Sequence, residues 1–390
     1  MINLFKRNVY LDNNATTYVS SAVRKTMNRV LKYHWGNPSS GYRKGKTAFQ
    51  IVEQARERVA KSIHAHSHEV YFTGCATESN NAVLKTLSNH FYPKKKKIIS
   101  TPIEHPSIMN TLEFLETQGI IVQYCPVDQF GFVSVQELEK LIDEDTFLIC
   151  CILANNEIGT IQNIKEIATL AKAKNILVMS DCVQAFGKIA IDVKELGVDY
   201  ATFSAHKLYG PKGVGALYAR ISSPLAPFIH GGHQEEGMRA GTESVHNIAG
   251  FGKACQEVDK LITYSNNIQL LKEHFIEQLK DIKPDTLINS PSENCLSNTI
   301  SITLPNINSR ELMMMLDFNG ISVSSGSACS TQLNKPSHVL KAIGLNDKEA
   351  EETIRISLGK DITRGDINYT IKIIDKYLKN YIEEINSNFC

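Results

Sequence analysis

The sequence predicts an α/β protein with two units, a large one built on a mostly parallel sheet covered by helices and a smaller α/β unit that follows it. From about residue 46 to 260, segments of helical period alternate with short apolar runs, a pattern typical of a helix-flanked parallel sheet. After a long helical stretch near 248–280, strands separated by helices resume. We expect a large domain at 15–260 and a small one formed by 1–14 and 261–390, with the site at their junction.

The individual elements follow from hydrophobic spacing and from the polar residues that bound each run. The first long helix is indicated by Ala48, Ile51, Val52, Ala55, Val59 and Ile63, which recur at helical intervals. Strands of the large unit are expected at 69–73, 97–101, 120–125, 147–153, 176–180, 200–204 and 214–219, with helices at 82–90, 108–118 and 164–174. Strands of the small unit are expected at 299–304, 321–324 and 353–358.

The composition excludes several classes of protein. The chain has 390 residues, of which 42% are hydrophobic and 21% charged, and its formal net charge is +1. These are ordinary values for a globular protein, and they give no electrostatic reason to expect nucleic acid or an anionic membrane as a partner. We find no apolar stretch of the roughly 20 residues that a membrane span needs. The first residues lack the pattern of a secretory signal.

The nine cysteines are scattered and contain no pair with C-x-x-C spacing. An odd, scattered set argues against a disulfide framework and against structural zinc, and it predicts a reducing, cytoplasmic location. His64, His66 and His68 alternate in one polar segment, but no cysteine or carboxylate cluster completes a metal site there. We therefore expect no metal.

A lysine and an aspartate at strand ends point to pyridoxal phosphate. Lys207 follows one expected strand, and Asp181 closes another. This cofactor needs an amine for a Schiff base with its aldehyde, and a carboxylate that keeps its pyridine nitrogen protonated. Lysines in loops are usually solvated and acids at strand ends usually act as caps, so neither residue is decisive alone. The pair, with Ser204 and His206 beside the lysine, favours the cofactor.

Other polar groups follow strand ends, where open α/β sheets bind ligands. The turn at 73–79 joins a strand to a helix and suits a phosphate, although Thr77 as a simple helix cap fits the sequence equally well. His105 could stack on a flat ring and relay protons, or be structural. Asn156 and Gln184 could bind a phenolate oxygen or cap loops.

Cys329 lies in a segment of small residues, Ser324 to Thr331. Small residues on both sides of a cysteine indicate an accessible loop in which the thiol can be a nucleophile. The alternative is a serine-rich connector with an incidental cysteine.

Taken together, these motifs resemble those of the cysteine desulfurases, which are class V enzymes of iron–sulfur cluster assembly that depend on pyridoxal phosphate. The resemblance runs from about residue 10 to 359, and the spacing after Cys329 is similar to that of the long-loop subclass, which supplies scaffold proteins. It implies the type I aminotransferase-like fold. The motifs are Asp12–Thr17, Gly36–Ser40, Ala76–Ser79, Asn155–Gly159, Ser204–Gly213, Arg239–Thr242 and Ser324–Cys329.

The resemblance implies a role for each matching position. Lys207 would form the Schiff base, Asp181 would hold the pyridine nitrogen, and His105 would stack on the ring. Gln184 and Asn156 would contact the phenolate side. Arg355 would bind the substrate carboxylate, with Asn156 as a second substrate-binding residue. Cys329 would accept the sulfur. The phosphate would be bound by Ala76, Thr77, Ser204 and His206, and by Thr242 from the other subunit of a homodimer.

The activity implied is conversion of L-cysteine to L-alanine with a persulfide on Cys329, which then supplies an iron–sulfur scaffold or another acceptor protein. Two alternatives stay open. One is a class V aminotransferase or selenocysteine lyase, in which Cys329 is less essential. The other is a sulfur-relay or scaffold-binding protein that keeps the fold without turnover. We expect Cys75 to be inert and Cys390 to be a terminal thiol without a carrier role.

Overall fold

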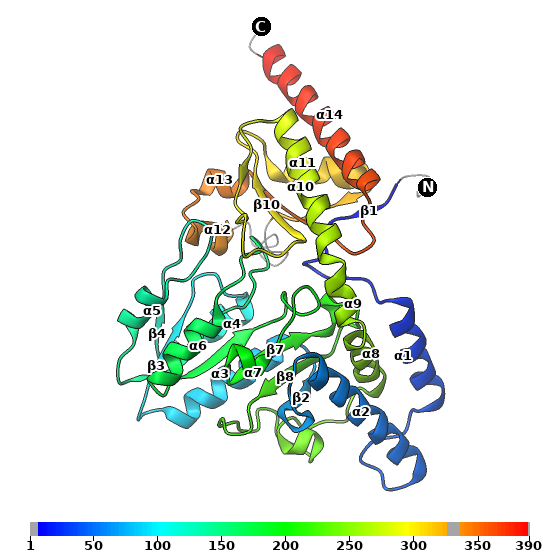
Figure 1. Ribbon diagram of the computed structural model, residues 1–390, viewed down its shortest axis with the longest axis vertical. Coiled ribbons are helices and arrows are strands. Elements are labelled where there is room, and N and C mark those ends of the chain that lie inside the picture. Colours follow the sequence, from blue (N-terminus) through cyan, green and yellow to red (C-terminus); the bar gives the residue numbers. More distant parts are fainter. Residues whose placement is uncertain (1–6, 326–335, 389–390) are drawn as a thin grey trace.

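The computed structural model describes residues 7–325 and 336–388, the side chains from residue 381 onward excepted. Cys329 and Cys390 lie outside the described residues. Figure 1 shows a helix-flanked sheet in the lower part of the molecule and a smaller unit above it, from which the last helix extends.

The described part of the chain forms a seven-stranded sheet in the order β2-β8-β7-β6-β5-β3-β4. Strand β8 runs antiparallel to both of its neighbours, while the pairs from β7 to β4 are parallel. The mostly parallel sheet predicted from the sequence is therefore confirmed. The strands are β2 (Val70–Thr73), β3 (Lys97–Ser100), β4 (Ile121–Tyr124), β5 (Thr146–Cys150), β6 (Leu177–Asp181), β7 (Tyr200–Ser204) and β8 (Gly215–Ala219).

Helices cover both faces of this sheet, and the alternation of side chains along each strand assigns residues to the two layers. Ile98 and Leu148 pack with α3 and α4 on one face. Ile99 and Ile149 belong to the larger core on the other face, with α2, α6 and α8. The helices of this unit are α1 (Ser21–Tyr33), α2 (Arg43–Ser62), α3 (Ala76–Phe91), α4 (Pro106–Glu116), α5 (Val135–Leu141), α6 (Ile164–Ala173), α7 (Val193–Leu196) and α8 (Val245–Cys255).

The smaller unit has an antiparallel sheet in the order β12-β10-β9 and a parallel pair, β1 with β11. In its hydrophobic core, side chains of α10, α11 and α14 pack against strands of the antiparallel sheet and of the parallel pair. Its strands are β1 (Val9–Tyr10), β9 (Leu287–Ile288), β10 (Thr299–Thr303), β11 (Ile321–Ser322) and β12 (Thr353–Ser357). Its helices are α10 (Ser265–Ile282), α11 (Ser309–Phe318), α12 (His338–Ala342), α13 (Asp347–Glu351) and α14 (Arg364–Asn388). The exact domain boundaries stay a prediction.

The helical stretch expected near 248–280 is confirmed as helical, but the chain divides it into three helices, α8, α9 (Val258–Thr263) and α10. The physical reason is that its two ends pack on different cores. Phe251 and Ala254 of α8 belong to the large core, whereas Phe275 and Leu279 of α10 belong to the small one. The chain must change direction between them. None of the helices that the structure describes is long and apolar enough to cross a membrane.

The packing of α8 on α2 depends on a glycine, and this gives a prediction about stability. A Cβ on Gly252 would lie 2.6 Å from the Cα of Ala55 and 2.7 Å from its Cβ. Because both contacts involve atoms fixed to the backbone of α2, Gly252→Ala must push the helices apart. We expect it to destabilise the protein by about 1–3 kcal/mol, measured by urea or thermal unfolding. The control is Gly41→Ala, where a Cβ meets nothing within 4 Å. Equal stability of the two variants would contradict this packing.

Candidate active site

A cavity of about 240 Å³ opens beyond the carboxyl ends of strands β3, β5, β6 and β7. In open α/β sheets this edge is where ligands bind. The structure brings most of the predicted site residues together here, although they are up to 279 positions apart in sequence, from Ala76 to Arg355. The predicted residues that line it are Ala76, Thr77, His105, Asn156, Asp181, Gln184, Ser204, His206, Lys207 and Arg355.

Two predicted residues are not placed in this cavity. Thr242 is exposed and lines a different hollow, beside Gly74 and Arg239. Cys329 belongs to the residues that the structure does not describe. Among the described residues, no group of three or more histidine, cysteine, aspartate or glutamate side chains is arranged to hold a metal ion.

The amino end of α3 forms one side of the cavity. Cys75 occupies the cap position in an extended conformation, and its side chain makes no capping hydrogen bond to the described residues. Thr77 is therefore not the cap, but lies in the first turn. A Cβ on Gly215 would come within 2.9 Å of the Ala76 nitrogen, so glycine there lets this helix end approach the sheet. The backbone N–H groups of an uncapped first turn are a binding site for an anion such as phosphate.

Asp181 is buried at the end of β6 and is held by two donors. The Val183 N–H donates to its Oδ1 at 2.9 Å, and Asn80 Nδ2 donates to its Oδ2 at 3.1 Å. Asn80 is itself fully buried, with Thr202 Oγ1 donating to its amide oxygen at 2.8 Å. The Asp181 carboxylate is thus fixed in the cavity wall. Its orientation is set in part by Asn80, a residue that the sequence analysis did not identify.

Both histidines of the site are held in the neutral form. His105 caps α4, and its Nδ1 accepts from the backbone N–H of Ser107 at 3.1 Å. Burial, with the positive charge of Lys207 adding to it, lowers the pKa of His105 against the opposing effect of Asp181. In the neutral ring the remaining proton is therefore on Nε2. Burial likewise lowers the pKa of His206 to about 3, and Lys207 adds to this shift.

The amine of Lys207 is directed at the backbone of the segment before α1. Its Nζ donates to the carbonyl oxygen of Asn14 at 2.5 Å and to that of Ala15 at 2.7 Å. Gln184 Nε2 donates to the same Asn14 carbonyl at 2.9 Å. The Asn14 carbonyl oxygen thus accepts hydrogen bonds from two of the predicted cofactor-binding side chains, Lys207 and Gln184.

The side chain of Asn14 is also fully used. Its Nδ2 donates to the carbonyl of Asn156 at 3.1 Å and to Thr299 Oγ1 at 2.8 Å. Its Oδ1 accepts from Lys188 at 2.9 Å and from Asn298 at 3.0 Å. Asn14 lies in a motif that the sequence singles out, but no role followed for it, because its partners come from many parts of the chain.

Arg355, on β12 of the small sheet, is 2% exposed. Its Nη2 pairs with Asp12 Oδ1 at 2.7 Å, and its Nη1 donates to the Asn156 carbonyl at 3.1 Å. Its buried Nε has no hydrogen-bond partner among the described residues. A buried guanidinium donor without a partner is costly, and it is available to an anionic group that enters the cavity.

The described residues on either side of 326–335 are bonded to the site. Before that segment, Ser324 exchanges two backbone hydrogen bonds with Arg355, at 3.1 and 2.6 Å. After it, Ser337 Oγ donates to Glu157 Oε2 at 2.6 Å. Glu157 belongs to the loop that carries Asn156, so both anchors lead directly to residues around the cavity.

Glu104, next to His105, gives a prediction about pH. It is fully buried, and burial raises its pKa to about 8, with the charge of Asp181 adding to the shift. The usual pKa of a glutamate is 4.5. Between pH 4.5 and 8, Glu104 therefore keeps a proton in the folded state that it has lost in the unfolded state. Stability must therefore fall as pH rises from about 4.5 to 8.

Glu104→Gln has no such proton to lose and keeps the oxygen that accepts from Thr101 and Ile152. We expect its free energy of unfolding, relative to the native chain, to rise between pH 5 and 8.5 by about 1.4 kcal/mol for each unit of pKa difference. Urea unfolding across this range measures it. The control is Glu113→Gln on the exposed face of α4. Parallel pH profiles for the native chain and Glu104→Gln would refute the assignment.

Comparisons with known proteins agree with this geometry. The model of the "Aminotransferase class-V" family matches residues 9–369. A protein named cysteine desulfurase IscS from Dictyoglomus turgidum is 42% identical, over 96% of this chain and 95% of its own. The homologue of that name from Methanosarcina thermophila is 41% identical, over 95% and 92%.

Solved structures agree as well. A structure titled NifS-like protein is 41% identical with a TM-score of 0.91, over 96% of this chain and 100% of its own. SspA in complex with cysteine is 36% identical with a TM-score of 0.80, over 90% and 99%. The chain belongs to the class V aminotransferase family and, within it, to the cysteine desulfurases.

Proposed function

We propose that this protein is a pyridoxal-phosphate-dependent cysteine desulfurase, which converts L-cysteine to L-alanine and carries the sulfur as a persulfide on Cys329. The observation that carries the proposal is one cavity that joins Lys207, Asp181, the free end of α3 and the unpartnered Nε of Arg355. The homologues named cysteine desulfurase and the related structure of SspA with cysteine support the same substrate.

The residues of the cavity fit pyridoxal phosphate. The uncapped end of α3, drawn close to the sheet at Gly215, suits the phosphate, and Ser204 and His206 lie beside it in the lining. Asp181 suits the pyridine nitrogen, and Lys207 supplies the amine. His105 suits stacking on the ring, with Asn156 and Gln184 on the phenolate side. When bound, this cofactor withdraws electrons from the Cα of an amino acid attached to it.

The protein's own side chains then have distinct tasks. Arg355 binds the carboxylate of L-cysteine through its free donor, and Asp12 holds the guanidinium in place. Lys207 Nζ takes the proton from the substrate Cα. The thiolate of Cys329 attacks the substrate sulfur, so the carbon–sulfur bond breaks as a sulfur–sulfur bond forms. Neutral His105 holds or moves a proton at Nε2.

The partners are a second copy of this chain and a sulfur-accepting protein, such as an iron–sulfur scaffold. Large apolar side chains are exposed together on α1, α2 and the segment between them, among them Tyr33, Trp35 and Phe49. Such a surface favours a homodimer. Thr242, exposed in its own chain, suits a role at the phosphate of the other copy. The cytoplasmic location stays a prediction from the cysteine usage.

Replacing Cys329 with alanine tests the assignment. We expect Cys329→Ala to keep the yellow absorbance of bound cofactor and to lose release of alanine and sulfide from L-cysteine by at least about 100-fold, because the nucleophile is gone. The matched control is Cys75→Ala, a thiol that lines the cavity, and it should retain turnover. Full turnover by Cys329→Ala would favour a class V lyase or aminotransferase, and loss in Cys75→Ala alone would move the acceptor to Cys75.

A further inference from the structure

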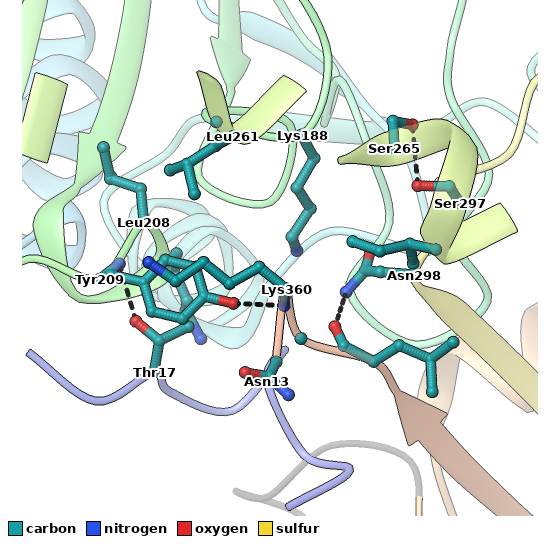
Figure 2. Close-up of a pocket in the computed structure, with 15 residues that line it drawn as sticks. Asn13, Thr17, Lys188, Leu208, Tyr209, Leu261, Ser265, Ser297, Asn298 and Lys360 are labelled. Atoms are coloured by element: carbon teal, nitrogen blue, oxygen red, sulfur yellow. Dashed lines mark hydrogen bonds between the residues drawn. The ribbon is translucent and has the colours of Figure 1, made fainter. Parts of the chain in front are cut away.

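Lys188 is a lysine close to the site that the proposed reaction does not use. It lies on the loop after β6 and reaches into a second, smaller cavity of about 40 Å³, which Lys207 also lines. Figure 2 shows its side chain extended with the amine end directed into that cavity. Its Nζ donates to Gln184 Oε1 at 2.6 Å and to Asn14 Oδ1 at 2.9 Å.

These two hydrogen bonds fix the orientation of two amides. Lys188 Nζ is the donor in both bonds, so the oxygen of each amide must face it. The N–H₂ group of Gln184 is then turned to the opposite side, where it donates to the Asn14 carbonyl. The N–H₂ group of Asn14 is turned to Asn156 and Thr299. With Lys188 removed, the Gln184 amide oxygen would lose this donor, and the bond to the Asn14 carbonyl alone would hold the amide in its orientation.

Lys188 also faces other positive charges. Its amine and that of Lys207 bond to the same residue, Asn14, one at the side chain and one at the main chain. Burial lowers the pKa of Lys188, and Lys207 and Arg355 lower it further. Repulsion between like charges is mutual, so the protonated form of Lys188 disfavours a proton on Lys207 Nζ. The other charged and titratable groups around the two amines are Lys360 and Tyr209 in the small cavity, and His105, His206, Asp181 and Arg355 in the larger one.

We propose that Lys188 is a positioning residue that orients the Gln184 amide toward the phenolate side of the cofactor and disfavours a proton on Lys207 Nζ. This inference rests on the proposed function. The two effects have the same direction, because an N–H donor at the phenolate oxygen and a nearby positive charge both stabilise the site after that proton has left.

The test is the pH dependence of the visible absorbance of the holoenzyme, whose midpoint reports the proton on Lys207 Nζ. Lys188→Met, similar in length but without donors or charge, should raise the midpoint by about one pH unit, a tenfold change in proton affinity. Lys188→Arg keeps donors and charge and should stay within about 0.3 unit of the native chain. A purely structural role would change stability and leave the midpoint in place.

The matched control is Lys360→Met. Lys360 lines the same small cavity, but its ammonium lies 4.2 Å from the centre of the Tyr209 ring. An unchanged midpoint in Lys188→Met, or an equal shift in Lys360→Met, would overturn the proposal. If Lys188→Met does not fold, Lys188→Gln keeps a donor and removes the charge. A raised midpoint there supports the proposal, and an unchanged one overturns it.

The role of Lys188 and the function of the protein are tested by different results. A native chain that binds the cofactor and turns over L-cysteine, beside a Lys188→Met midpoint that does not move, removes only the role of Lys188. A native chain without a visible cofactor band removes both that role and the function on which it rests.

Discussion

The site depends on the hydrogen bonds of one buried asparagine. Asn14 is 1% exposed, and each of its polar groups has a partner. Its N–H donates to Ser357 Oγ, its carbonyl receives Lys207 and Gln184, and its side chain bonds to residues of both units. Because a buried polar group without a partner costs about 1–3 kcal/mol, Asn14 has a single favourable arrangement. That arrangement fixes the segment before α1 between the two sheets.

The residues that we propose to act on one small molecule come from different layers of the fold, and Asn14 holds them together through its hydrogen bonds. Lys207 and Gln184 follow strands β7 and β6 of the large sheet, whereas Ser357 and Arg355 lie on β12 of the small one. Arg355 and Asn14 both donate to the carbonyl of Asn156. The guanidinium that we propose to bind the substrate is thus positioned by the same contacts as the side chains proposed for the cofactor. The two units therefore cannot shift independently without breaking several buried hydrogen bonds.

Much of the fold could be predicted from the sequence, because strands and helices of the large unit are encoded locally. The apolar run at 200–204 and the helical spacing from Ala48 to Ile63 each predict their element without reference to the rest of the chain. The break of the 248–280 stretch into α8, α9 and α10 could not be predicted. It reflects which of two cores each end packs against, and hydrophobic period carries no such information.

The site likewise contains residues that could be predicted from the sequence and residues that could not. Lys207, Asp181 and Arg355 could be named because their chemistry and motifs are specific, and they line one cavity. The supporting residues could not. Asn14 bonds to residues 142 to 343 positions away, Asn80 to Asp181 across 101 positions, and Lys188 matters only through Asn14 and Gln184. Amides and lysines are common on protein surfaces, so nothing in the local sequence distinguishes Asn80 or Lys188, and the motif around Asn14 gives that residue no role.

The most direct measurement is the affinity of the apoprotein for pyridoxal phosphate when Asn14 is replaced by alanine, followed by visible absorbance. The control is Asn81→Ala, whose amide bonds only to the Thr77 carbonyl at the surface of α3 among the contacts described. If the Asn14 hydrogen bonds position the site, Asn14→Ala weakens cofactor binding by about tenfold or more, equivalent to about 1.4 kcal/mol, and Asn81→Ala does not. Native affinity in Asn14→Ala would contradict the central role given to this residue.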